Sequence, residues 1–200
     1  MLDPMEIASD TFRQVMGRFA TGISVVTTFE DGSAGGSDVG EGGRTASRPA
    51  GITVNALSSV SLEPPLVMVA LDRSRFITPM VRSLGRYAVN ILGEDQQALS
   101  DCFAHAPVSP GREAFCGASW SPGPTGLPLL EGAIATLECT VIQTFSAGDH
   151  DLFIGHVDSL AATGDEATDG RAAIPLLYFR RRYLRIERGA DSPVEGKPEG

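Results

Sequence analysis

The chain of 200 residues has little positive charge and no long apolar run. Its 16 basic residues face 25 acidic residues, which gives a formal net charge of -9, whereas a protein that binds duplex nucleic acid usually has a positive charge. No stretch approaches the roughly 20 apolar residues that span a bilayer. The first ten residues are acidic and lack the basic and apolar regions of a secretory signal peptide. We therefore expect a cytoplasmic protein that binds neither nucleic acid nor membrane.

Cysteine and histidine are scarce as well, with three residues of each kind. An odd number of cysteines without a C-x-x-C motif argues against a disulfide framework and against a thiol redox motif. Cys139 lies within the apolar segment LECTV and is predicted to be a small core residue. The cysteines and histidines do not have the spacing of a zinc finger. The sequence thus predicts no metal site.

The composition is otherwise that of an ordinary globular protein, with 42% hydrophobic and 20% charged residues. This length and composition predict a single domain over residues 1–187. Residues 30–50 are rich in glycine and serine and are expected to form a long mobile loop. A role of this loop as a functional flap is an open alternative. The polar residues 188–200 are expected to be a disordered tail.

Most of the predicted secondary structure is β. Strands are predicted at 23–29, 51–57, 66–71, 86–92, 133–145 and 150–162, with a last pair of strands or one bent strand at 175–186. Helices are predicted at 9–20, 74–84 and 94–104, the first capped by Ser9 or Asp10 and the second interrupted by Pro79. In the first helix, four apolar residues recur at helical spacing and form one apolar helix face: Phe12, Val15, Met16 and Phe19. Because strands and helices do not alternate, a mostly β fold whose sheet closes into a small barrel is favoured.

Residues 51–65, GITVNALSSVSLEPP, hold the most informative polar pattern in the chain. Short hydroxyl and amide side chains lie here among strand residues. They are compatible with an edge strand that runs into a serine-rich turn. That interpretation is favoured by the residues alone. The alternative is a platform for a planar heterocycle, because such side chains and free backbone N–H groups bind ring edges and phosphate oxygens without demanding charge.

This segment resembles the G-x-T-x-N-S-x-x-S-V-S-L-x-P-P motif of the flavin reductase-like proteins. Other segments resemble the same family in the same order along the chain: FRQVMGRFATGISVVTT at 12–28, LVMVALDRS at 66–74, GRYAVNIL at 85–92, GLPLLEGAIATLEC at 126–139, GDHDLFIGHV at 148–157 and PLLYFRRRY at 175–183. The resemblance covers residues 9–187. Each motif alone is modest evidence for the family, whereas the occurrence of all of them in the same order is specific for it.

The resemblance implies a Greek-key split barrel of the FMN-binding type, with a few short flanking helices, that forms a homodimer. It also implies an NAD(P)H:flavin oxidoreductase that transfers hydride from nicotinamide C4 to N5 of FAD or FMN. Free reduced flavin would then go to a partner monooxygenase or halogenase. Two alternatives are a non-catalytic flavin carrier or sensor on the same fold, and a pyridoxamine-phosphate type oxidase, which the G-D-H and serine-rich segments disfavour. FAD against FMN, and NADH against NADPH, stay open.

The resemblance also assigns candidate site residues. Those implied to line the flavin are Thr53, Val54, Asn55, Ala56, Leu57, Ser58 and Ser59. Those implied near its phosphate are Asp72, Ser74 and Arg75, and those near the nicotinamide nucleotide are Asp149 and His150. Because the cofactors supply the redox chemistry, no catalytic acid or base is expected. Local positive potential is expected from Arg44, Arg73 and Arg75.

The chain departs from the family pattern at three places. Ala56 stands where the family has serine, so a hydrogen bond there would come from the backbone. Phe76 or Ile77 replaces a hydroxyl residue, unless Thr78 takes its place. Arg181 replaces a glycine. Arg181 belongs to a cluster of arginines that is expected to form mostly a solvated strand face. The alternative is that one of these arginines contacts a cofactor phosphate. The cluster comprises Arg180, Arg181, Arg182 and Arg185.

Overall fold

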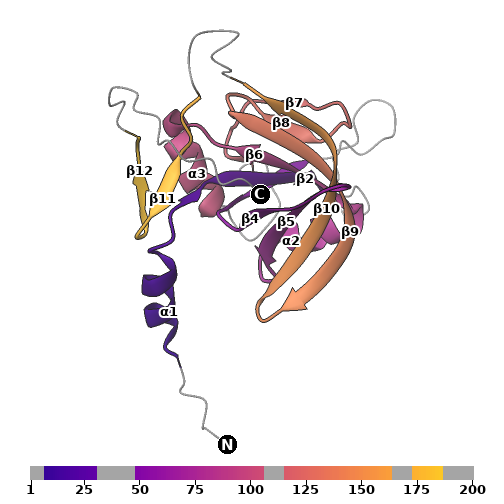
Figure 1. The fold of residues 1–200 in the computed structure, drawn as a ribbon. Helices are drawn as coiled ribbons and strands as arrows, with labels where there is room; N and C mark the ends of the chain where they lie inside the picture. Colours follow the sequence, from indigo (N-terminus) through magenta and orange to yellow (C-terminus); the bar gives the residue numbers. More distant parts are fainter. Residues whose placement is uncertain (1–6, 31–47, 106–114, 164–172, 187–200) are drawn as a thin grey trace, which may run out of the picture.

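The computed structural model describes residues 7–30, 48–105, 115–163 and 173–186. Nearly all of the predicted 30–50 loop, the predicted 188–200 tail and Arg44 lie outside the described residues. The described residues form a mostly β protein in which one large curved sheet is flanked by short helices (Figure 1). The predicted fold class is thereby confirmed.

The large sheet has seven antiparallel strands in the order β3-β2-β6-β9-β10-β5-β4. Their bounds are β2 Ser24–Phe29, β3 Pro49–Val54, β4 Leu57–Leu62, β5 Pro65–Asp72, β6 Arg86–Ile91, β9 Ala135–Ala147 and β10 His150–Ala162. Two small sheets pair β1 Thr21–Gly22 with β11 Leu177–Phe179 and β12 Arg182–Leu184, and β7 Trp120–Pro122 with β8 Pro128–Leu130. The helices are α1 Ser9–Met16, α2 Ile77–Leu84 and α3 Gln97–Ala104, the last preceded by the 3₁₀ turn η1 Glu94–Gln96.

The strand order forces the large sheet to close. β3 and β4 are its two edges, yet only Asn55 and Ala56 separate them along the chain. In a flat sheet, six spacings of about 4.8 Å would put these edges roughly 29 Å apart, whereas the link from Val54 to Leu57 spans at most about 11 Å. The sheet therefore curls until β3 and β4 adjoin at these two residues. Ala70 N donates to Ala56 O at 3.2 Å, which extends the β4–β5 ladder up to the junction. We call Asn55–Ala56 the closing corner.

Apolar side chains fill the interior of this barrel. Val26, Val69 and Phe153 are fully buried, and Val81 of α2 packs into the same core. A second core cluster lies where α3 packs against the sheet and contains Phe103 and Phe115, whose rings meet edge to face at 5.4 Å between centroids. Along β10, buried and half-buried residues alternate, as the two-residue period of a strand requires.

Two predicted elements have other bounds than expected. The predicted strand 51–57 ends at Val54, and the serine-rich residues that follow the closing corner form a strand of their own, β4. The predicted helix 9–20 ends at Met16, and Ala8, rather than Ser9 or Asp10, precedes it as an N-cap without a side-chain bond. Pro79 is accommodated because α2 begins at Ile77, so its missing N–H falls in the first turn, where helices leave N–H groups unpaired.

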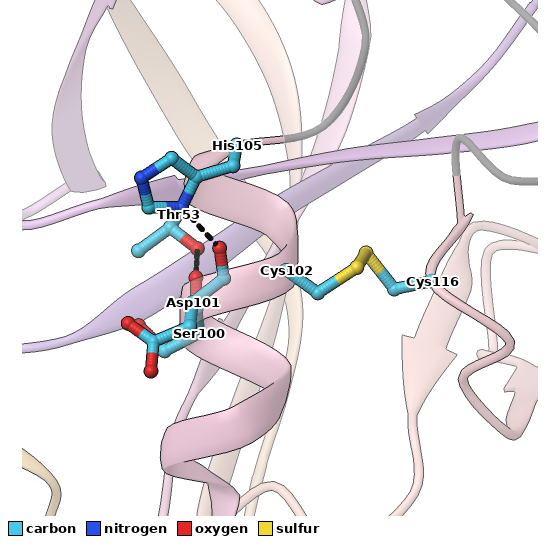
Figure 2. Close-up of a disulfide and its surroundings, with 6 residues drawn as sticks. All are labelled: Thr53, Ser100, Asp101, Cys102, His105 and Cys116. Atoms are coloured by element: carbon cyan, nitrogen blue, oxygen red, sulfur yellow. Dashed lines mark hydrogen bonds between the residues drawn. A yellow bond between two sulfur atoms is a disulfide. The ribbon is translucent and has the colours of Figure 1, made fainter.

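The prediction that the cysteines form no disulfide was wrong. Cys102 of α3 and Cys116 are joined, with their Cα atoms 6.0 Å apart (Figure 2). Their approach follows from the packing of Phe103 on Phe115, one residue away from each, and local spacing in the sequence does not contain that information. Cys139 is buried and unpaired, as predicted, and burial raises the pKa of its thiol to about 12.

No helix among the described ranges is long and apolar enough to cross a membrane.

Asn90 of β6 provides a test of the fold, because its side chain links three elements from a fully buried position. It donates to Val25 O at 3.1 Å and to Thr27 Oγ1 at 3.0 Å, and it accepts from Leu130 N at 2.8 Å. Asn90→Ala leaves these buried groups without their hydrogen-bond partner and should lower the free energy of unfolding in urea by roughly 1–3 kcal/mol. Gln143→Ala, at an exposed position of β9, should change it by less than about 0.5 kcal/mol. Equal effects of the two substitutions would contradict the described network.

Candidate functional site

A cavity of about 280 Å³ opens beside the closing corner. It is lined by residues of β3 and the corner, of β5, of α3 and of β10: Ile52, Thr53, Val54, Asn55, Ala56, Ala70, Leu71, Asp72, Arg75, Ala104 and His150. Most of the sequence-predicted flavin residues are therefore brought together with the predicted nicotinamide residue His150. We call this the corner cavity.

Pairing between strands brings His150 to the cavity. It is the first residue of β10 and lies opposite Asp72, the last residue of β5. β5 in turn reaches the closing corner through the bond from Ala70 N to Ala56 O. The predicted flavin segment and the predicted nicotinamide residue thus meet because the sheet closes here, although they are far apart in the sequence.

α3 forms one wall of the corner cavity. Thr53 Oγ1 donates to Ser100 O at 2.7 Å (Figure 2), and Ala104 lines the cavity. The helix packs directly on β3 at Gly51, where an added Cβ would lie 2.5 Å from the ring of Phe103. The Thr53 hydroxyl therefore helps to hold α3 in place, and its oxygen can still accept a hydrogen bond from a ligand in the cavity.

The turn after β5 is built around the carboxylate of Asp72. Ser74 N and Ser74 Oγ donate to Asp72 Oδ1 at 2.8 Å and 2.7 Å, and these hydrogen bonds hold the pKa of Asp72 below its usual range. Thr78 is buried and donates to Asp72 O at 2.6 Å, so it does not take the place of the family's hydroxyl. Arg75 is left as the cationic side chain among the described residues that line this cavity.

The turn between β9 and β10 fixes the ring of His150. His150 Nδ1 donates to Asp149 Oδ1 at 2.7 Å, and this bond holds the pKa of Asp149 below its usual range. Arg73 N donates to Asp149 O at 3.0 Å, and the Arg73 guanidinium donates to Gly148 O. Arg73 therefore holds this turn in place and is not among the residues that line the cavity. Nε2 is the ring nitrogen that His150 has left for a ligand.

A second cavity, of about 630 Å³, lies on the other side of the closing corner. Asn55 and Ala56 line both cavities, and Leu57 and Ser58 line this one alone. The rest of its lining comes from α1 and the segment after it, from β1, β5 and β11, and from the β11–β12 turn, through Phe12, Arg13, Met16, Gly17, Phe19, Thr21, Met68, Tyr178 and Arg181. The hydroxyl of Thr21 is buried without a partner at this cavity, which marks it as a position for a ligand donor or acceptor.

The residues that recur at helical spacing in and after α1 form an apolar face, as the sequence predicts, and Phe12, Met16 and Phe19 of this face line the second cavity. Phe12, Val15, Met16 and Phe19 are 51–71% exposed. Periodicity shows that a face is apolar and leaves open what covers it.

Four arginines line a third cavity of about 290 Å³ next to the second one: Arg13, Arg18, Arg180 and Arg181. Arg180 and Arg181 form the β11–β12 turn with positive φ values of 48° and 63°, a conformation that glycine adopts most easily. The turn therefore explains why the family has a glycine at the position of Arg181. Arg180 and Arg181 do not lie on a solvated strand face as expected, whereas Arg182 is an exposed residue of β12.

The remaining predicted site residues lie around these cavities. Ser59 is exposed on β4, and Ser74 and Asp149 act on Asp72 and His150 from outside the lining of the corner cavity. The described residues contain no group of three or more histidine, cysteine, aspartate or glutamate side chains that could hold a metal ion.

Comparison with known proteins adds to this geometry. Residues 16–187 match the family described as "Flavin reductase like domain". An NADH-dependent flavin reductase from a Rhodococcus species is 36% identical over 96% of this chain and 94% of its own. The reductase subunit of a flavin-dependent monooxygenase from Mycobacterium tuberculosis is 33% identical over 97% and 91%. The NADH:FAD oxidoreductase of Streptomyces globisporus, solved with NAD and FAD fragments, is 30% identical over 96% and 99%, with a TM-score of 0.71.

The Asp72 turn generates a prediction about acid titration. Because the folded-state pKa of Asp72 is lowered, its ionised form stabilises the fold at neutral pH, and this contribution is lost as the pH falls through that pKa. Ser74→Ala removes the hydroxyl donor and should raise the pKa of Asp72 toward the usual aspartate value. Carbon-13 NMR titration of the side-chain carboxyls measures this shift. Ser59→Ala is the control and should leave it unchanged. An Asp72 pKa that is the same in both variants would contradict the described turn.

Proposed function

The chain belongs to the flavin reductase-like family, and on that premise we propose that it is an NADH-dependent flavin reductase. It would transfer hydride from nicotinamide C4 to N5 of FAD or FMN and release the reduced flavin. The observation that supports this best is the corner cavity, which brings the predicted flavin residues 53–56 together with Arg75 and His150. The relatives are described as NADH-dependent flavin reductases and as a monooxygenase reductase subunit.

The residues at the closing corner fit a flavin. Asn55 and Ala56 lie between β3 and β4, outside both strands, so their main-chain N–H groups can meet the polar edge of a ring. The second cavity offers apolar surface from Met68 and Leu57 for the rest of the ring system. Arg75 offers a guanidinium, which suits phosphate oxygens. Ala56 lacks the serine hydroxyl of the family, so the backbone would supply the contact at that position.

The chain's own contribution to the reaction is positioning. A bound flavin supplies the hydride acceptor. The closing corner would hold the flavin ring, and His150, whose own ring is already fixed by Asp149, would orient the nicotinamide next to it. Holding the two rings in contact removes most of the entropic cost of a bimolecular step. The N–H groups of the corner would supply donors for negative charge on the flavin, in the manner of an oxyanion hole.

The working form would be a homodimer in the cytoplasm. Phe12, Met16 and Phe19 of the α1 region and Val60 and Leu62 of β4 are all more than half exposed. Monomeric proteins rarely expose large apolar patches. In addition, β4 pairs in the sheet with β5 alone, and native proteins usually cover such an edge. A second copy that packs on α1 and β4 would cover this surface and would close the second cavity from outside.

A separate flavin-dependent monooxygenase or halogenase would receive the reduced flavin. The relative from Mycobacterium tuberculosis is described as the reductase subunit of such a monooxygenase.

The proposed activity is tested by following NADH absorbance with FMN or FAD in large excess over purified protein. Many turnovers for each protein molecule are expected, and NADPH in place of NADH should react more slowly. Bound flavin without turnover would contradict a reductase and would favour a carrier or sensor on the same fold.

His150 generates a prediction about the nicotinamide. His150→Ala should raise the KM for NADH about tenfold and leave the Kd for flavin nearly unchanged, because the ring is proposed to orient only the nicotinamide. His156→Ala is a matched control, because His156 is half-buried on the same face of β10, is paired with Asp158, and lies outside the cavities. A change confined to the flavin Kd would assign His150 to the flavin instead.

Asn55 generates a prediction about the flavin. Asn55→Asp places a negative charge at the corner, against the proposed ring site, and should weaken FMN binding about tenfold, which corresponds to about 1.4 kcal/mol. Gln143→Glu adds the same charge at an exposed position of β9 and should have no effect. Fluorescence titration of FMN provides the measurement, and unchanged affinity in a folded Asn55→Asp protein would remove Asn55 from the site.

A further inference from the structure

The Cys102–Cys116 disulfide lies beside the wall of the corner cavity, at the surface of the protein. Cys102 is an exposed residue of α3, and Cys116 is half-buried. Figure 2 shows the disulfide on the side of α3 opposite to Thr53. Small thiols and peroxides can therefore reach it. Exposed disulfides are the ones that are reduced and re-formed most readily, and in reducing compartments such disulfides usually have a redox role.

The disulfide acts on the same helix that shapes the corner cavity. Ser100 O accepts the hydroxyl of Thr53, and Ala104 lines the cavity. Phe103 lies between them and packs on Gly51 without room for a Cβ. These contacts occupy the last five residues of α3, and Cys102 is one of the same five. Any change in the position of this end of the helix must therefore change the cavity.

Cys116, the other half of the disulfide, links the helix covalently to a second packed segment of the chain. Cys116 follows Phe115, which is buried against Phe103 in the second core cluster. With the disulfide formed, the end of α3 is held both by the covalent bond and by this ring contact. With the disulfide reduced, the ring contact remains and the covalent restraint is lost, which leaves more conformations open to the end of the helix.

We propose that Cys102 and Cys116 form a reversible redox-modification site that sets how tightly the corner cavity holds flavin. The disulfide form holds the wall at Ser100 and Ala104 in place and binds flavin more tightly, whereas the dithiol form releases flavin more readily. This proposal rests on the proposed function, because the ligand of the cavity is taken to be flavin.

The oxidant is hydrogen peroxide, which arises when released reduced flavin meets oxygen before a partner enzyme consumes it. The thiolate of Cys102, the more exposed of the two, attacks one peroxide oxygen, forms a sulfenic acid and expels hydroxide, which leaves as water. The thiol of Cys116 then attacks the sulfenic sulfur, and a second water leaves as the disulfide forms. Two thiols and one peroxide thus give one disulfide and two waters. A dithiol reductant returns the two electrons and protons by thiol–disulfide exchange.

As a consequence, the affinity for flavin responds to whether the released reduced flavin is consumed. When the reduced flavin is consumed, little peroxide forms and the dithiol form continues to release flavin. When it is not consumed, peroxide closes the disulfide, and more of the flavin stays bound.

The test is a fluorescence titration of FMN into the whole protein in two states, one treated with a dithiol reductant that is then removed and one re-oxidised with a stoichiometric amount of hydrogen peroxide. Alkylation of the unfolded protein should count three thiols in the reduced state and one, Cys139, in the oxidised state. The oxidised state should bind FMN about fivefold more tightly. Cys102→Ser and Cys116→Ser should each show the affinity of the reduced state and no response to peroxide. Cys139→Ala should keep the full response.

Two results would overturn the proposal. The first is the same FMN affinity in both states, although alkylation shows that the disulfide has formed. The second is that peroxide leaves three thiols free. A protein that binds no FMN in either state would instead contradict the proposed function, and the redox proposal would fall with it. The alkylation count and the titration together distinguish these cases.

Discussion

The two-residue link between β3 and β4 is the constraint on which the rest of the structure depends. These strands are the opposite edges of a seven-stranded sheet, and Asn55–Ala56 can join them only if the sheet closes. The pairing of β4 with β5 places the end of β5 beside the corner, and β10 follows β5 through its ladder. Closure brings the end of β3 to the same place. The corner cavity is thus a product of the closure, with flavin-type residues on one wall and His150 on another.

Much of this could be predicted from the sequence. The hairpin of β9 and β10, the helices α2 and α3 and the mostly β class follow from local patterns of apolar and polar residues. The resemblance to the family then identified Thr53–Ala56 and His150, which the structure places in one cavity. What local patterns could not give is contact between distant segments. The approach of Cys102 to Cys116 and the bond from Thr53 to Ser100 both depend on how α3 packs on β3.

Other differences between prediction and structure arose because a local sequence pattern does not specify what surrounds it. The apolar face of α1 is periodic, yet the single chain leaves it exposed, because a period cannot say whether this chain or another one covers a face. Arg180 and Arg181 form a turn whose positive φ values favour glycine. The run of arginines does not contain the usual glycine signal of such a turn and therefore predicted a strand face. Ser74 and Thr78 had the right hydroxyls for a phosphate, but both donate to Asp72.

The central claim is that closure of the sheet at Asn55–Ala56 creates the flavin site. A crystal structure of the protein with FMN tests it most directly. The account predicts that the ring lies against the main chain of the closing corner, with its phosphate near Arg75 and its open face toward His150. A flavin ring bound elsewhere, such as in the cavity lined by Arg13, Arg18, Arg180 and Arg181, would contradict the account.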